Sequence, residues 1–186
     1  MVKRGKEEVQ PRIVQLGPDT LSNHETQDTP PPDKNNATRI VRSISIRAPL
    51  ERCFELITRQ LEKTPDWDPM IMQVDPISIK HVRVGSMSRV AFNLSDANAF
   101  EEAIAMIRFF RPNKAISWAS THSTRLQEEW QVQHQPSGTI VTLILGYNPT
   151  GSLLRRLASR ISLRRQLEKA VSETLENLKA TAERPQ

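Results

Sequence analysis

The stretch RIVRSISIRAPLERCFELI, residues 39–57, joins a strand pattern to a helix pattern and decides how the fold begins. Ile40, Ile44 and Ile46 share one face of an alternating segment, as in a half-buried strand. Pro49 suits the first turn of a helix, where its missing N–H is not needed. Apolar residues then recur at positions 50, 54, 57 and 61, which is helical spacing. The stretch therefore predicts a strand that runs directly into a short amphipathic helix.

Six further strand-like runs follow a turn at Pro65–Pro69. Two connections between them, RPNK at 111–114 and QPSG at 135–138, have the composition of hairpin loops. Consecutive hairpins favour an antiparallel sheet. The six runs are Met70–Lys80 with a break at Pro76, Gly85–Leu94, Phe100–Phe110, Ala115–Thr121, Thr124–His134 and Thr139–Tyr147.

A long amphipathic helix is expected from Ser152 to Ala182. With 100° per residue, its apolar side chains fall within about 40° of the direction of Val171, and a helix of about 30 residues would be roughly 45 Å long. Arg160 and Arg164 also lie near the centre of this stripe. Either the helix bends there and both arginines reach solvent, or they point at the inside of the sheet.

The composition predicts one folded domain after an N-terminal tail. Residues 1–37 contain Pro11, Pro18 and the triplet Pro30–Pro32 among polar residues, so we expect this segment to be disordered. Residues 38–184 are expected to form the domain, which is long enough to bury a substantial core.

The charge pattern excludes several classes of function. The formal net charge is +5, but basic and acidic residues are interleaved and no basic run contains stacking aromatic residues, so we expect no nucleic-acid partner. No apolar run is long enough for a membrane span, although peripheral membrane contact remains open. The single cysteine, Cys53, allows no internal disulfide, and no secretory signal pattern is present; we expect a cytoplasmic protein. The four histidines lack metal-ligand spacing, so neither a metal nor a cofactor is expected.

The order of these motifs resembles the START-related helix-grip superfamily, in its polyketide cyclase/dehydrase and lipid-transport branch. The resemblance implies an α+β fold in which a curved antiparallel sheet of about seven strands wraps around a long C-terminal helix. It rests on Arg42–Ile46 with Ala48–Pro49, Pro65–Trp67, Arg111–Asn113 followed by Trp118, Trp130 with Gly138–Thr139, and Ala170–Glu183.

The resemblance also implies a function. It implies a deep cavity between the sheet and the C-terminal helix, in which members bind sterols, lipids, quinones, hormones or polyketides. The preferred expectation is binding of a hydrophobic or amphipathic small molecule without catalysis. One alternative is a polyketide cyclase/dehydratase, with Glu128, Tyr147 or His122 transferring protons. Another is an interaction module like the quinone- or ribosome-associated relatives.

One strand suggests how such a cavity would hold a polar group. In Thr124–His134, strand parity puts Glu128 on the inward face together with Trp130. A buried lone carboxylate is costly unless it is paired or protonated, and its natural partner is Arg160 or Arg164 from the covering helix. The hypothesis is that at least one arginine reaches Glu128 and orients an acidic or polar ligand. A bulge that turns Glu128 outward, or a purely structural ion pair, are the alternatives.

Other candidate ligand contacts are large side chains near strand ends or turns. Trp67, in the turn, is expected at the cavity mouth, and Tyr147 at its entrance. Phe92, Met87 and Met106 are expected to line the same space. The full candidate ligand-binding set is Glu128, Trp130, Arg160, Arg164, Trp67, Phe92, Met106 and Tyr147, with no catalytic residue assigned.

Overall fold

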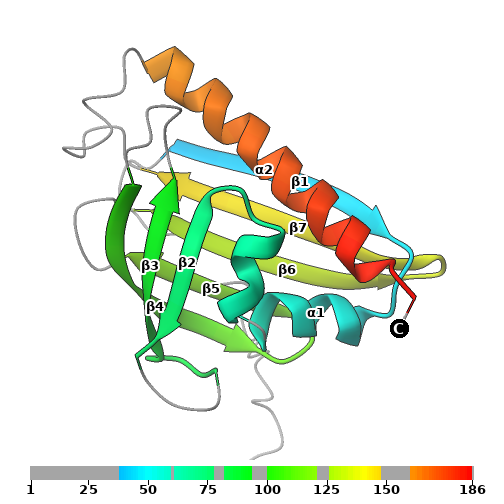
Figure 1. The fold of residues 1–186 in the computed structure, drawn as a ribbon. Coiled ribbons are helices and arrows are strands. Elements are labelled where there is room, and N and C mark those ends of the chain that lie inside the picture. The colour runs from blue at the N-terminus through cyan, green and yellow to red at the C-terminus, as the bar shows by residue number, and fades with distance from the viewer. Residues whose placement is uncertain are drawn as a thin grey trace, which may run out of the picture.

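The computed structural model describes residues 38–59, 61–77, 82–93, 100–120, 126–147 and 160–185. In these residues a single seven-stranded antiparallel sheet curves around two helices and a short 3-10 helix (Figure 1). The α+β helix-grip architecture expected from the sequence is therefore confirmed. The tail at residues 1–37, for which we expected disorder, lies outside the described part of the chain.

The elements follow the predicted order, with strand order β1-β7-β6-β5-β4-β3-β2 across the sheet. Every neighbouring pair is antiparallel, so β2 to β7 form a continuous meander and β1 joins β7 at one edge. The bounds are β1 Thr38–Ile46, α1 Leu50–Thr58, η1 Leu61–Asp66, β2 Ile71–Pro76, β3 Met87–Asn93, β4 Phe100–Arg111, β5 Ala115–Ser120, β6 Gln127–Gln135, β7 Gly138–Tyr147 and α2 Arg160–Ala182.

Two predicted hairpin loops form tight turns with residues of positive φ. In the β4–β5 turn Asn113 has a φ of 57°, a conformation that asparagine tolerates better than most residues. Gly138, at the start of β7, has a φ of +137° and lies against the end of β1. A Cβ at this position would overlap the carbonyl oxygen of Ile46, so glycine is required there for two independent reasons.

Helix α2 packs across β1 and β7, on the side of the sheet that also holds α1 (Figure 1). The predicted apolar stripe is confirmed where α2 is described. Its members Leu167, Val171, Leu175, Leu178 and Ala182 are all buried. The part of the predicted helix before residue 160 lies outside the described residues.

The arginine at 164 does not follow the predicted stripe. Leu163, Leu167, Val171 and Leu175 are four residues apart and buried. Each four-residue step turns the buried face by about 40°, so this face runs obliquely around the helix. At the level of Arg164 the buried face centres on Leu163, about 100° away, and the arginine side chain is therefore exposed.

Helix α1 closes one end of the curved sheet and is tied to α2. Its buried face includes Cys53, Phe54 and Ile57, and the Phe54 ring lies 5.8 Å from that of Phe110 on β4. On its other side, the Arg52 guanidinium donates to the Arg184 carbonyl at 2.7 Å, just past the end of α2. This contact satisfies a carbonyl at the helix C-terminus, where a cation is favourable.

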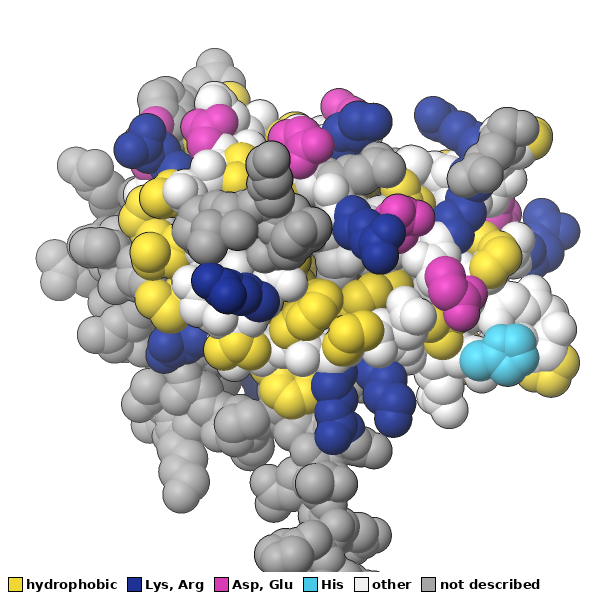
Figure 2. Space-filling view, turned by 90° about the horizontal axis from the view of Figure 1, so that it is seen from below, with side chains coloured by type: hydrophobic (Ala, Val, Ile, Leu, Met, Phe, Trp, Pro, Cys, Tyr) yellow, Lys and Arg dark blue, Asp and Glu magenta, His cyan; other side chains and the backbone are white. Residues whose placement is uncertain are grey.

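The surface carries both basic and acidic side chains. On the face shown in Figure 2, Lys and Arg side chains are spread among acidic and hydrophobic ones rather than gathered into a stripe. Exposed large apolar residues include Met72 and Ile77 near the β2 edge and Val41 on β1. This interleaving agrees with the solvated surface that the sequence predicted.

A candidate ligand site

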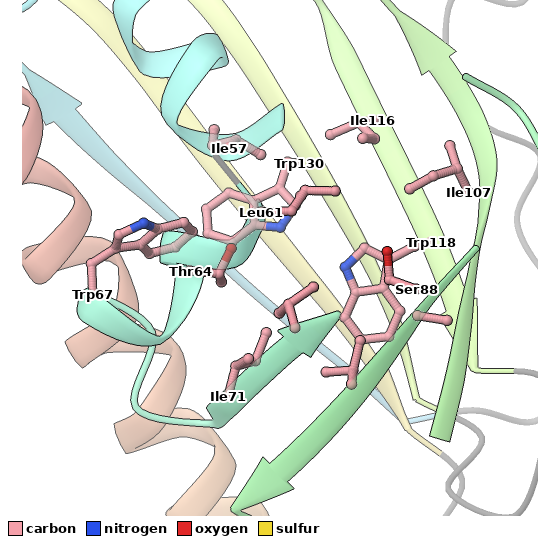
Figure 3. Close-up of a pocket in the computed structure, with 13 residues that line it drawn as sticks. Ile57, Leu61, Thr64, Trp67, Ile71, Ser88, Ile107, Ile116, Trp118 and Trp130 are labelled. Carbon is pink, nitrogen blue, oxygen red and sulfur yellow. The ribbon is translucent and has the colours of Figure 1, made fainter. Parts of the chain in front are cut away.

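A cavity of about 60 Å³ lies between the α1–η1 segment and the inner face of the sheet. The described lining is mostly aliphatic and aromatic. Apart from the tryptophan N–H groups, its polar side-chain groups are the hydroxyls of Thr64 and Ser88 (Figure 3). None of the described lining residues comes from α2, so the cavity, as far as its lining is described, lies under α1 and η1 and not between the sheet and the C-terminal helix as expected. The lining residues are Ile57, Leu61, Thr64, Trp67, Ile71, Val74, Ser88, Val90, Ala105, Ile107, Ile116, Trp118 and Trp130.

All three tryptophans of the chain line this cavity. Trp67 follows η1, Trp118 belongs to β5 and Trp130 to β6. The Trp67 and Trp130 rings meet edge to face at 5.8 Å, and Phe92 stacks on Trp118 at 5.9 Å. Trp67 is buried at one wall of the cavity, whereas its expected place was the mouth. Phe92 supports Trp118 from behind and is not itself a lining residue.

Strand geometry brings Glu128 to two of these indoles. Trp118 on β5 is directly opposite Glu128 in the β5–β6 register, and Trp130 is two residues along β6 on the same face. Both indole N–H groups donate to the same carboxyl oxygen, Glu128 Oε2, at 3.2 Å and 3.1 Å. Glu128 is only 4% exposed. The predicted inward orientation is therefore confirmed, and a bulge that would turn Glu128 outward is excluded.

A second buried carboxyl lies near the first. Asp68 follows Trp67 and is 1% exposed. Its Oδ1 accepts from the Met70 backbone N–H at 2.9 Å and from the Thr174 hydroxyl of α2 at 3.0 Å. Its Oδ2 is buried and no residue in the described part of the chain donates to it. Asp68 thus joins the turn after η1 to the centre of α2.

Burial sets the protonation of this pair. Loss of hydration, together with the nearby Asp68 charge, raises the pKa of Glu128 to about 8, although the hydrogen bonds from Trp130 and Trp118 oppose the shift. Burial likewise raises the pKa of Asp68 to about 6, against the hydrogen bonds from Met70 and Thr174. Near neutral pH, Glu128 is therefore mostly a neutral acid and Asp68 mostly a carboxylate.

The arginine partner expected for Glu128 is not seen at Arg164. The Arg164 side chain is exposed and pairs with Glu168 one helical turn away, with Nε to Oε1 at 2.9 Å. The side chain of Arg160 lies outside the described part of the structure. Glu128 has two tryptophans as partners instead, so the hypothesis of an Arg164–Glu128 contact is wrong. The interior polar cluster, as far as it is described, is acidic.

Strand parity also corrects two of the expected lining residues. On β4 the inward residues are Ala105 and Ile107, so Met106 between them is on the outer face. Met87, its register partner on β3, shares that outer face. The sequence argument overlooked that Met87 and Phe92 are five residues apart and cannot share a face of one strand. Tyr147 is buried at the end of β7 but does not line the cavity, and His122 lies outside the described residues.

Sequence reasoning missed most of the aliphatic residues that line the cavity, and it also missed three residues of the Glu128–Asp68 cluster. Asp68 precedes Pro69 and accepts from the residue two positions on, a common role of aspartate in turns. Thr174 interrupts the apolar stripe of α2, and a polar residue there was a signal for a buried partner. Trp118 is part of the family resemblance, but its position opposite Glu128 follows from the β5–β6 register, which is not evident from the sequence.

The sequence matches a known protein family over most of its length. The family described as polyketide cyclase / dehydrase and lipid transport matches residues 37–183, most of the chain. The chain belongs to this family. The match contains every element of the described fold and all residues of the site. A comparison with curated proteins found no match.

Solved structures support the fold of the family. The ginseng major latex-like protein 151 from Panax ginseng has 12% identity and a TM-score of 0.61, over 80% of this chain and 99% of that one. The Zhui aromatase/cyclase from Streptomyces sp. R1128 has 15% identity and a TM-score of 0.62, over 80% and 94%. A protein from Thermus thermophilus has 19% identity and a TM-score of 0.62, over 78% and 96%. At these identities the likeness concerns the fold alone.

Two features are absent from the described residues, a membrane-spanning helix and a cluster of metal-ligating side chains. No described helix is long and apolar enough to cross a membrane. No group of three or more metal-ligating side chains is present among the residues that the structure describes.

Proposed function

We propose that this protein binds a hydrophobic or amphipathic small molecule in the cavity lined by Trp67, Trp118 and Trp130. The observation behind this proposal is the lining itself, in which three indoles and a set of aliphatic side chains enclose unfilled space. Cavities with mostly apolar walls and a few polar groups are the usual form of small-molecule sites. The family description, with its cyclases and lipid transport, agrees with such a ligand.

The cavity must enlarge to hold a complete ligand. Its volume is about 60 Å³, whereas sites for drug-sized molecules occupy roughly 300–1,000 Å³. A ligand therefore displaces side chains or segments at the wall as it enters. The two hydroxyl groups, on Thr64 and Ser88, are available to orient an uncharged polar atom.

A neutral fluorescent probe provides the test. N-phenyl-1-naphthylamine should bind the protein with one-to-one saturation, followed by its own emission. Ala105→Phe places a ring in the cavity and should weaken binding at least about tenfold, since it occupies the space the ligand needs. Ala119→Phe is the matched control, because Ala119 is opposite Met106 in register and faces outward. A wild-type protein without saturable binding, or an Ala105→Phe variant that binds as well as Ala119→Phe, would contradict the proposal.

An enzymatic role ranks second. A buried acid that is mostly neutral near pH 7 is the kind of group that protonates a substrate. A general acid must also reach the reacting atom, and Glu128 is not among the residues that line the cavity. Its Oε2 already accepts two hydrogen bonds from the wall. The geometry therefore favours binding over proton transfer.

A further inference from the structure

The cavity has an uncharged wall with acidic groups behind it. Its described lining residues are apolar, aromatic or hydroxyl-bearing, and none of these carries a formal charge. Glu128 touches the wall through the N–H edges of Trp118 and Trp130. Asp68 follows the third indole, Trp67, directly in the chain and lies close enough to Glu128 to raise its pKa. Both of these ionisable groups behind the wall thus have the same sign.

Within the part of the chain that the structure describes, no ion pair cancels the charge of these two carboxyl groups. Each element packed against them presents a neutral group: the indoles from β5 and β6, the Met70 amide after η1, and the Thr174 hydroxyl from α2. Arg164, the expected cation, is at the surface with Glu168. Asp68 Oδ2 is buried without a donor in the described residues. Among the described residues, the ionisable groups behind the cavity wall are therefore acidic, and they act on a ligand through a medium that screens poorly.

The indoles themselves favour a positive group. Because the N–H groups of Trp118 and Trp130 already donate to Glu128, these donors are engaged, and the rest of each ring is what the two indoles can offer to a ligand. Ring faces attract cations through the negative side of their quadrupole, most strongly in tryptophan. The aromatic wall and the carboxyl pair behind it thus favour the same sign of ligand charge.

We propose that the ligand is an apolar, ring-containing molecule with one basic nitrogen, and that the Asp68–Glu128 pair makes the cavity reject carboxylates. This specificity rests on the proposed function, since it concerns the ligand of the same cavity. It is opposite to the preference for acidic ligands that inward arginines would have given. Binding of a cation favours the second ionisation of the pair, so a proton is released on binding.

The test compares three compounds that share a naphthalene ring. They are 2-naphthylmethylamine, 2-naphthamide and 2-naphthoate, which at pH 7 are positive, neutral and negative. Each is measured by displacement of N-phenyl-1-naphthylamine. The amine should bind at least about tenfold more tightly than the carboxylate, with the amide between them. Calorimetry of the amine in two buffers of different ionisation enthalpy should detect proton release.

Two variants assign the preference to the carboxyl pair. Glu128→Gln keeps an oxygen for both indoles but can no longer ionise when a cation binds, and Asp68→Asn removes the negative charge of the second group. In each, the ratio of amine to carboxylate affinity should fall at least about fivefold while the affinity for the amide stays unchanged. Glu129→Gln is the matched control, because the neighbouring residue faces the other side of β6 and pairs with Arg39. If Asp68→Asn does not fold, Glu128→Gln alone decides.

The outcomes separate this inference from the proposed function. If the probe and the amide bind but the carboxylate binds as tightly as the amine, the specificity is wrong and the binding function stands. The specificity is also wrong, and the binding function also stands, if the amine binds more tightly than the carboxylate but by the same ratio in Glu128→Gln as in wild type. If the probe and all three compounds fail to bind, both the function and the specificity are wrong.

Discussion

Replacing Glu128 by glutamine should make the protein more stable at alkaline pH. The neutral acid and the amide both present an oxygen to the indole N–H groups of Trp118 and Trp130, but only the acid ionises. The folded protein keeps the proton of Glu128 up to a pKa of about 8, whereas the ordinary value is 4.5. Between these values the folded state binds more protons than the unfolded state. The free energy of unfolding of the wild type therefore falls as pH rises through this window. The stabilising contribution of Glu128 is fully present below pH 4.5.

The size of the effect follows from linkage. One proton difference changes the free energy of unfolding by about 1.4 kcal/mol per pH unit. Over the window for Glu128 the upper limit is on the order of 5 kcal/mol, a large part of the roughly 5–15 kcal/mol typical of a domain. Asp68, with a pKa raised to about 6, adds a smaller loss at lower pH. We expect Glu128→Gln to be about 2–5 kcal/mol more stable than wild type at about pH 8.5 and within about 1 kcal/mol of it at about pH 4.5.

Urea unfolding followed by tryptophan emission, from about pH 4.5 to about pH 8.5, measures this difference. Ionisations far from residue 128 cancel when the variant is subtracted from wild type, whereas that of the neighbouring Asp68 contributes to the difference. Glu129→Gln, with the same chemical change on the outward face, should give a nearly constant difference. If the difference for Glu128→Gln is also constant with pH, the burial argument fails. If the variant is less stable throughout, Glu128 has a cationic partner after all.

Three smaller predictions concern contacts that hold the site in place. Gly138→Ala should lower the free energy of unfolding by about 3 kcal/mol, measured by urea titration, because its Cβ meets the Ile46 carbonyl at a positive φ; an unchanged midpoint would show that β1 shifts freely. Thr174→Val removes the donor to Asp68 Oδ1 and should cost about 1–3 kcal/mol, with a larger loss at about pH 7.5 than at about pH 5 since the lost bond is to a charged acceptor; an equal loss at both values would argue that Asp68 stays neutral. Arg52→Met should increase amide hydrogen exchange in the last turn of α2 and leave its centre unchanged; protection that is the same in both would show that the cap contributes nothing.

The sequence was sufficient for the architecture because period and order are local properties. Alternation in the strand segments, hairpin loops between them and the apolar stripe of the last helix each follow from neighbouring residues. Glu128 was correctly assigned to the inward face on the same ground. These features do not depend on which strand lies beside which.

The site depended on register and phase, which are not local. The cross-strand contact of Glu128 with Trp118 follows from the β5–β6 register. The exposure of Arg164 follows from an oblique contact line on α2, which a straight stripe could not represent. A buried carboxyl group can be stabilised either by a cationic partner or by staying protonated. Here a raised pKa and two indole donors take the place of a cation.

The pairing of β1 with β7 has a consequence for how the chain folds. Ser43 and Thr142, which share a hydrogen bond across these strands, are 99 positions apart, whereas β2 to β7 follow one another as hairpins. Of the described strands, β1 is synthesised first, but it can join the sheet only after β7, the last of them, has formed. Contacts of such long sequence separation slow folding, because a large loop must close before they form. Until β1 pairs with it, this edge of β7 has open backbone N–H and C=O groups, so the partly folded chain is most prone to aggregation at that edge.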